Sequence, residues 1–331
     1  MLSPNRPSKR PREDADQMPD IIRSSDYWFN DGSVILQAES VQFRVGKSLL
    51  AVHSPVFRDM FSMPLSADEP LVEGCPVVFL AGDSAADWEQ LLDAMYPKHY
   101  FPDEVPTLES LSAVLRLSKK YNIASFLQYC VARLRAEFPT QLDEFQKVSE
   151  EWTNIHVPDS HASIAVQVNV IKLAREIGLY SILPGAYYAI ISSQNPEKEG
   201  IFSPEFSKLS LLDQAKCLKG HARLVQSFTS TPHKWLDDSC LPSMFCLSIG
   251  REKCERLRVA QLLRTERRAR KIVAIFEAWD ARWTEGFCVN CDRTGMDKFV
   301  LTQKECWKKL PGYFDLPSWD ALLAMDSDLD A

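Results

Sequence analysis

The stretch DGSVILQAESVQFRVGKSLLAVHSPVFRDMF, residues 31–61, decides the fold of the first half of this chain. An apolar run followed by alternating apolar residues predicts a β-hairpin over residues 34–45 that turns near residues 39–40. Apolar residues at helical spacing in residues 49–63 predict two short helices with Ser54-Pro55 at the joint. The stretch contains no nucleophile motif, phosphate loop or metal site.

The bulk composition is that of an ordinary globular protein. The 331 residues, with 45% hydrophobic side chains, allow about two domains. The net charge of -7 and pI near 5.5 argue against a chain that coats nucleic acid or an anionic membrane. We expect no transmembrane segment and no secretory signal. Nine cysteines without a disulfide framework indicate reduced thiols, so we expect an intracellular protein, cytoplasmic and/or nuclear.

Composition divides the chain into three segments. Residues 1–25 are rich in Pro, Ser and charged side chains and cannot bury enough apolar surface to offset the entropy of ordering, so we expect a disordered tail. Within it, Lys9-Arg10-Pro11-Arg12 resembles a short nuclear-import signal, and a solvated charge run is the alternative. A compact domain is predicted over residues 26–138 and a helical domain over residues 139–331.

The order of the elements predicted in residues 26–138 favours an α+β domain. The hairpin and the helix pair are followed by a β-branched strand at residues 76–80 and then by helices. The helix from Ile123 has the clearest pattern, because its apolar side chains recur at i, i+3, i+4, i+7, i+8 and i+11.

Beyond Pro139 the pattern is mostly α-helical. Amphipathic spacing predicts helices near residues 168–177 and 182–191. A stripe of isoleucine and aromatic residues between Ile272 and Trp283 predicts a third, long helix that begins near Lys253.

Short motifs follow one another through the first half in a characteristic order and spacing. They are Asp31-Gly32-Ser33-Val34, Phe43, Lys47-Ser48-Leu49-Leu50-Ala51, Ser54-Pro55-Val56-Phe57, Met60-Phe61, Val77 to Leu80, Leu91-Leu92 with Met95-Tyr96, Leu115 to Tyr121 with Ile123, and Cys130 to Leu134. In this order they resemble a BTB/POZ domain, a short β-sheet with flanking helices. The chain departs from the family at Val45-Gly46-Lys47, where a histidine is usual.

Three strings in the second half resemble the helical continuation of BTB proteins from mushroom-forming fungi. They are Leu173-Ala174-Arg175-Glu176, Ile182 to Tyr188, and Leu310-Pro311 to Trp319.

The resemblance implies a protein-interaction module without catalysis, which acts as a scaffold or adaptor. Its partners would be other proteins, including a second copy of the chain. An exchanged N-terminal helix is not favoured, because the segment before Tyr27 is polar and Pro-rich. A cullin-type ubiquitin ligase is another implied partner, but Leu65-Ser66-Ala67 lacks the glutamate of the apolar-x-Glu motif and Leu71-Val72-Glu73 fits it only formally. The residues expected at the interface, together with the 63–74 loop, are Tyr27, Trp28, Phe29, Val34, Phe43, Phe57, Met60 and Phe61.

Cysteines in the second half form a candidate metal site. Cys288 and Cys291 are spaced as C-x2-C, and Cys240 and Cys246 form a looser pair upstream. Four thiolates could hold a structural zinc ion between two helices. Further candidate ligands are Cys254, Cys306, His221 and His233. The alternative is free thiols without any cofactor.

A basic run at residues 264–271 supports a hypothesis from another class. In this hypothesis the protein is a nuclear, transcription-related regulator. Its second half would contact nucleic acid through the basic run and the cysteines. The acidic remainder of the chain favours a solvated helix face instead. No sequence motif of an enzyme is present, so we expect a non-enzymatic protein.

Overall fold

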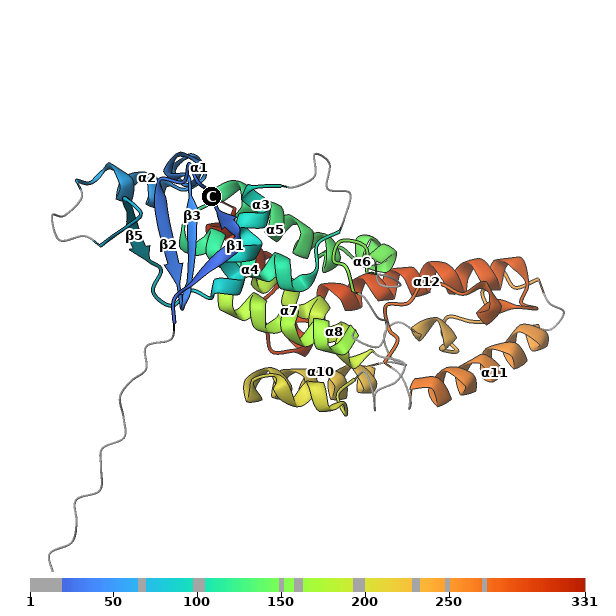
Figure 1. The fold of residues 1–331 in the computed structure, drawn as a ribbon. Coiled ribbons are helices and arrows are strands. Elements are labelled where there is room, and N and C mark those ends of the chain that lie inside the picture. The colour runs from blue at the N-terminus through green and yellow to red at the C-terminus, as the bar shows by residue number, and fades with distance from the viewer. Residues whose placement is uncertain are drawn as a thin grey trace, which may run out of the picture.

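The structure is a computed structural model, and it describes residues 20–64, 70–97, 105–148, 152–157, 163–192, 200–227, 233–247, 251–269 and 273–330. Figure 1 shows an elongated molecule with a β-sheet at one end, a helical middle and a pair of helices at the other end. The α+β class predicted from the sequence is confirmed.

The sheet has five strands in the order β1-β3-β2-β5-β4. β2 and β3 form the predicted antiparallel hairpin, in which Leu36 lies opposite Phe43 and Glu39 takes a positive φ of 50° in the turn. β2 also pairs in parallel with β5, and β1 pairs in parallel with β3. The bounds of the strands are β1 (Ile22–Trp28), β2 (Val34–Ala38), β3 (Val41–Val45), β4 (Leu71–Val72) and β5 (Cys75–Phe79).

β1 lies partly inside the segment that the sequence predicted as a disordered tail. It begins at Ile22, so the expected boundary at residue 25 is corrected. Only Ser24 and Tyr27 of this strand are buried, and the backbone holds it in place, with the Ile22 amide donating to the Ser40 carbonyl at 2.7 Å. A mostly polar edge strand leaves no apolar alternation in the sequence. The basic string at residues 9–12 lies outside the described residues.

The predicted helix pair is confirmed as α1 (Lys47–His53) and α2 (Pro55–Ser62). Ser54 separates them, and its hydroxyl accepts the Phe57 amide at 3.2 Å, which caps α2. The same hydroxyl donates to the Tyr121 carbonyl at 2.5 Å. One buried serine therefore joins the helix pair to the helices that follow.

Asp83 connects the helix that follows it to the end of the next helix in the N-terminal half. Its carboxylate is buried and accepts hydrogen bonds from Trp88 Nε1 at 2.9 Å and from the Tyr121 hydroxyl at 2.5 Å, and it pairs with Lys120. Burial and the hydrogen bond to Asp83 raise the pKa of Tyr121 well above its ordinary value. These two helices are α3 (Ala85–Met95) and α4 (Leu108–Lys120), and α5 (Ala124–Glu137) follows them.

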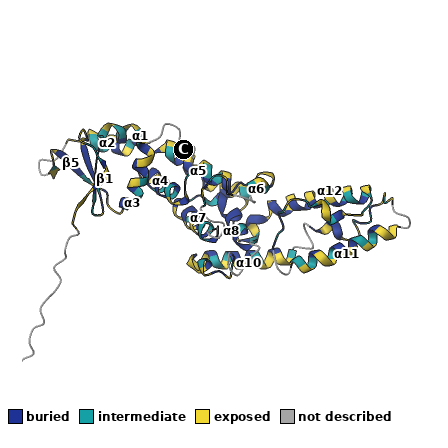
Figure 2. Ribbon diagram, turned by 45° about the vertical axis from the view of Figure 1, so that its right-hand side comes forward, coloured by how far each residue is buried: buried dark blue, intermediate teal, exposed yellow. Residues whose placement is uncertain are grey.

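One hydrophobic core crosses the boundary predicted at residue 138. Trp307, from the far end of the chain, stacks near Phe145 with a ring separation of 4.8 Å and donates to the Thr140 carbonyl at 2.7 Å. Figure 2 shows buried residues running from the sheet through the helical middle. The N-terminal half and most of the C-terminal half therefore share a core. The helices involved are α6 (Leu142–Val148), α7 (Ser163–Ile177), α8 (Leu183–Ile191), α10 (Leu211–Ser227), α13 (Leu310–Tyr313) and α14 (Trp319–Met325).

A second, smaller hydrophobic cluster lies at the end of the molecule far from the sheet (Figure 1). We call this end the distal lobe: residues 233–247, α11 (Glu252–Ala269), residues 279–288 and the first part of α12 (Val289–Lys308). Its buried members are Trp235, Leu236, Leu241, Cys254, Cys291 and Phe299.

The long helix predicted from Lys253 through Trp283 is wrong. α11 ends at Ala269, and residues 273–280 are not helical. The Tyr188 hydroxyl accepts the amides of Ile275 and Phe276 at 3.0 and 3.1 Å, and Gln303 donates to the Ile275 carbonyl at 2.9 Å. Side chains from α8 and α12 satisfy the backbone hydrogen-bonding groups of this non-helical segment. Partners so distant in the sequence cannot be predicted from local spacing. Among the described residues, none of the helices has the length and apolar character to cross a membrane.

We expect Asp83→Asn to lower the free energy of unfolding by about 1–3 kcal/mol, because the amide cannot serve as an anionic acceptor for the two buried donors and the Lys120 ammonium. Glu89→Gln, on the exposed side of α3, is the matched control and should change stability by less than about 0.5 kcal/mol. Urea unfolding followed by tryptophan fluorescence measures both, and equal effects would contradict the role of Asp83.

We also expect Gly220→Ala to destabilise the helical middle by about 1–3 kcal/mol. A Cβ at this position in α10 would come within 2.1 Å of the Phe314 ring. Gly312→Ala is the control, because nothing lies within 4 Å of its Cβ, and the better helix propensity of alanine should stabilise it by up to about 1 kcal/mol. Thermal unfolding of both variants tests the contact, and a neutral Gly220→Ala would contradict it.

Candidate functional site

The residues predicted at a protein interface divide into two groups. Four of them are buried in the N-terminal core, so their side chains cannot reach a partner in this conformation and that part of the prediction is corrected: Tyr27, Val34, Phe43 and Phe57. The other four are half-buried and pack against the core or beside it, and their contact with a partner stays a prediction: Trp28, Phe29, Met60 and Phe61.

The most exposed apolar side chains of the helix pair are different ones. Val52 is 77% exposed at the end of α1, Met63 is 64% exposed just after α2, and Val56 is 39% exposed at the start of α2. Together with half-buried Met60, we call these residues the α1–α2 face. Val52 and Val56 lie on either side of Ser54, where α1 ends and α2 begins. Exposed apolar groups on neighbouring helices are a feature of surfaces that bind proteins.

Four cysteines come together at the outer tip of the distal lobe. The Sγ atoms of Cys246, Cys254, Cys288 and Cys291 all lie within 4.8 Å of one another. Cys254 is in the first turn of α11, Cys288 caps α12, and Cys291 is in the first turn of α12. The structure therefore joins three of the four predicted metal ligands with one of the further candidates.

Cys240, the fourth predicted ligand, is not a member of this group. Its Sγ lies 3.8 Å from the Ser239 hydroxyl, and Cys254 takes the fourth corner because α11 starts at the same tip as α12. Cys306 is buried in the main core, and neither His221 nor His233 belongs to the group.

Backbone amides donate to three of the four sulfur atoms. The amide of Ser243 donates to Cys291 at 3.3 Å, and that of Leu247 donates to Cys288 at 3.4 Å. Burial alone would raise the pKa of Cys288, but hydrogen bonds from Leu247 and from the neighbouring cysteines outweigh it and lower that pKa to about 6. For Cys291 burial dominates, and its pKa is raised.

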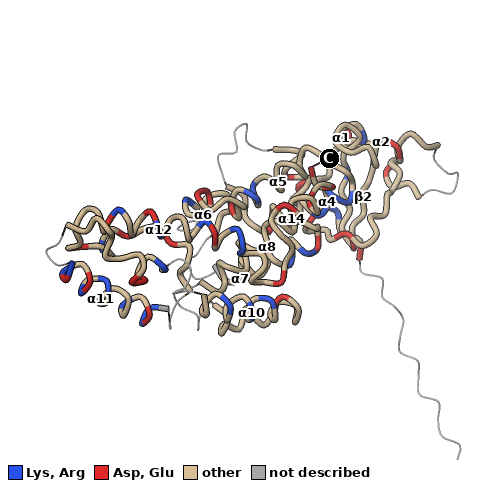
Figure 3. Tube along the Cα trace, turned by 180° about the vertical axis from the view of Figure 1, so that it is seen from behind, with Lys and Arg blue, Asp and Glu red and all other residues tan. Residues whose placement is uncertain are grey.

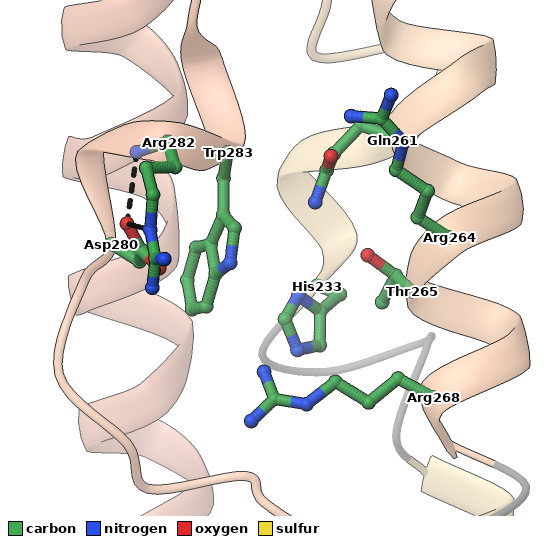
Figure 4. A pocket seen from close by; sticks show the side chains of 8 residues that line it. All are labelled: His233, Gln261, Arg264, Thr265, Arg268, Asp280, Arg282 and Trp283. Atoms are coloured by element: carbon green, nitrogen blue, oxygen red, sulfur yellow. Dashed lines mark hydrogen bonds and ion pairs between the residues drawn. The ribbon is translucent and has the colours of Figure 1, made fainter.

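A cavity of about 320 Å³ lies in the same lobe, between α11 and the segment around Trp283. Figure 4 shows His233 between the Trp283 ring and the side chains of α11. Two of its cations are paired: Arg268 makes a bidentate pair with Glu277 at 2.6–2.7 Å, and Arg282 pairs with Asp280 at 2.6 Å.

The basic run predicted to contact nucleic acid lies on α11 as far as the structure describes it, because residues 270–272 are outside the described part. Figure 3 shows both signs of charge along this helix. Arg258 pairs with Glu255 and Arg268 with Glu277, so acidic groups offset part of the positive field. These contacts give no support to nucleic-acid binding.

The comparison with known families identifies the N-terminal half. Residues 30–137 match the family model of the BTB/POZ domain. The chain contains a BTB/POZ domain. The match covers the hairpin, the helix pair, β5 and the helices to α5, which are the elements that carried the resemblance in the sequence. None of the curated proteins compared with the chain matches it.

BTB domains mediate interactions with other proteins, including copies of themselves, so the matched region has a role in protein–protein interaction. The cullin-type motif lies partly outside the described residues, since residues 65–69 are not described. In the described part, Leu71 and Val72 form β4, and Glu73 makes ion pairs with Arg23 at 2.7 Å and Arg44 at 3.1 Å. This glutamate therefore contributes to the BTB domain itself, and a cullin partner stays a prediction.

We expect the distal lobe to lose stability in acid through His233. Burial, and then the charge of Arg268, lower the pKa of this histidine to about 4. The unfolded chain, with a histidine pKa near 6.5, binds a proton that the folded lobe excludes. The stability contributed by the neutral ring is therefore complete above about pH 6.5 and falls by up to about 1.4 kcal/mol per pH unit toward about pH 4.

His233→Phe keeps an aromatic ring beside Trp283 and Phe299 and removes the titration, so it should flatten this part of the stability–pH curve. His156→Phe, at an exposed position, is the control and should leave the curve unchanged. The unfolding midpoints of the wild-type chain and the two variants, measured between pH 4 and pH 7, test this role of His233. If His233→Phe leaves the stability–pH curve unchanged, His233 is not the source of the acid sensitivity.

Proposed function

We propose that this protein is a non-enzymatic adaptor whose BTB domain binds a second protein through the α1–α2 face. The observation that carries this proposal is the exposure of Val52, Val56 and Met63 on the helix pair of a domain whose other large apolar residues are mostly packed in the core. Burying such side chains against a partner contributes roughly 25 cal/mol per Å² of apolar surface. A face of this kind is favourable to cover and costs little polar desolvation.

The pairing of β1 supports a contact between surfaces over an exchange of strands. β1 completes the sheet of its own chain through β3, and Phe29 donates its amide to the Arg44 carbonyl at 2.9 Å. Tyr27 adds a buried ring and a hydrogen bond to Asp93. A partner, including a second copy of the chain, can then dock on the α1–α2 face without opening the sheet.

The shape of the molecule supports the adaptor role. The helical middle is continuous with the BTB core, and it carries the distal lobe at the end opposite the sheet (Figure 1). Ion pairs such as Arg175–Asp213 at 2.8 Å and Arg135–Asp330 at 2.5 Å connect helices of this middle part to one another. A partner on the BTB domain would thus be held at a fixed place relative to anything bound by the second half.

We expect Val52→Glu to weaken partner binding by at least about tenfold, because a carboxylate would be buried without a counter-ion. Val300→Glu, on α12 at an exposed site of the same residue type, is the matched control and should not weaken it. Two measurements apply: sedimentation velocity for binding of a second copy, and comparison of the proteins retained from host-cell extract by wild-type and variant chains. If neither self-association nor any retained protein is lost selectively in Val52→Glu, the proposed face is wrong.

A further inference from the structure

The four cysteines of the distal lobe are arranged as a complete ligand set. We propose that Cys246, Cys254, Cys288 and Cys291 bind one zinc ion that holds together the tip of the distal lobe. This site is independent of the BTB domain, and it does not rest on the function proposed above.

The distances fit a tetrahedral ion. Four thiolates about 2.3 Å from a zinc ion lie roughly 3.8 Å from one another. The Sγ atoms of Cys246 and Cys288 are 3.8 Å apart, and all four sulfurs lie within 4.8 Å of each other. A disulfide would require a separation of about 2.05 Å, and none of the four cysteines forms one. The gap between the sulfurs is therefore too wide for covalent pairing and right for an ion.

The ligands come from three separate parts of the chain. Cys246 follows a turn in which its amide donates to the Ser243 carbonyl at 2.9 Å. Cys254 stands in the first turn of α11, and Cys288 and Cys291 stand at the start of α12. The amino ends of both helices thus meet at the sulfurs, and the helix dipoles favour negative charge there.

Backbone donors point at the sulfurs in the manner of a second ligand shell. Besides the amides of Ser243 and Leu247, the Cys288 amide approaches Cys254 Sγ at 3.5 Å. Neutral thiols are weak acceptors, whereas a metal-bound thiolate gains from each such donor. Three amides aimed at three different sulfurs are explained by thiolates better than by thiols.

The donor set selects the metal and its role. Soft thiolates in a tetrahedral set of four suit zinc or iron, and zinc needs no redox partner. With four protein ligands the ion has no open position for water or substrate, so its role is structural.

The buried hydrophobic cluster of the distal lobe is small. Among the described residues its buried cluster has six members, and two of them, Cys254 and Cys291, are proposed ligands. A core of this size rarely orders a structural unit without a crosslink or a metal. The ion would fix the 241–247 loop and both helix starts at one point.

Metal analysis of the whole chain, purified without chelator, tests the proposal. We expect about one zinc per wild-type chain and the same for the control Cys240→Ser, whose thiol lies in the same segment outside the group. Cys246→Ser and Cys288→Ser should weaken zinc binding by more than the roughly 10–100-fold that loss of an outer-shell partner causes. The proposal is wrong if the wild-type chain and Cys240→Ser both lack zinc, or if they contain iron instead. It is also wrong if all variants retain zinc equally.

A second measurement needs only the wild-type chain, in case the serine variants fail to fold. Cobalt added to metal-stripped protein should give the intense thiolate-to-cobalt absorption of a tetrahedral site, and zinc should abolish it. Hydrogen exchange should show that metal removal unprotects amides in residues 241–247 and in the first turns of α11 and α12, while the β2–β3 hairpin stays protected. Absence of the cobalt bands, or exchange that is unchanged at the tip, would refute a structural zinc ion.

Discussion

The arrangement of the molecule depends on α12, which alone among the described helices contributes residues to the main core and to the distal cluster. Cys291 and Phe299 lie in the distal cluster, whereas Cys306 and Trp307 lie in the main core. Sixteen residues separate Cys291 from Trp307, which at 1.5 Å per residue is about 24 Å of rigid helix. The tip of the distal lobe is therefore held at a distance that the helix sets, and the packing of Trp307 against residues 140–145 anchors the near end.

The main core makes the BTB domain part of a larger unit. Lys119, at the end of α4, donates to the Ile177 carbonyl at 2.5 Å, and buried Asp326 accepts the backbone amides of Tyr180 and Ser181 at 2.6 and 3.2 Å. These contacts join the BTB helices, α7 and the chain's last turns. A substitution in the C-terminal helices can thus alter the BTB domain through packing, without touching the α1–α2 face.

The sequence predicted local structure well where local residues decide it. The hairpin is specified by alternation and by a turn at Glu39, and the helix pair by Ser54-Pro55, all within about 30 residues. Exposure was predicted less well: Phe57 and Phe43, which were expected at the interface, are core residues, whereas Val52 near the end of α1 is exposed. β1 was missed because backbone pairing, and not apolar side chains, holds most of it. The non-helical segment at residues 273–280 was missed because its hydrogen-bond partners are about 28–88 positions away.

The cysteine group shows the same limit in a sharper form. The C-x2-C pair at Cys288 is a local feature and could be read directly, but the choice between Cys240 and Cys254 depends on where α11 begins relative to α12. Cys254 is only eight positions from Cys246, a spacing without a recognisable motif, and only the meeting of the two helix starts gives it a role.

The two ends of the protein are stabilised by different groups of residues. Two of the described buried residues of the distal cluster are thiols of this group, so any ion they bind contributes to the folding of that lobe, while the BTB sheet rests on Asp83 and on an apolar core that contains none of the four. If the group binds zinc as proposed, order at the tip would change with metal supply while the α1–α2 face at the opposite end keeps its shape.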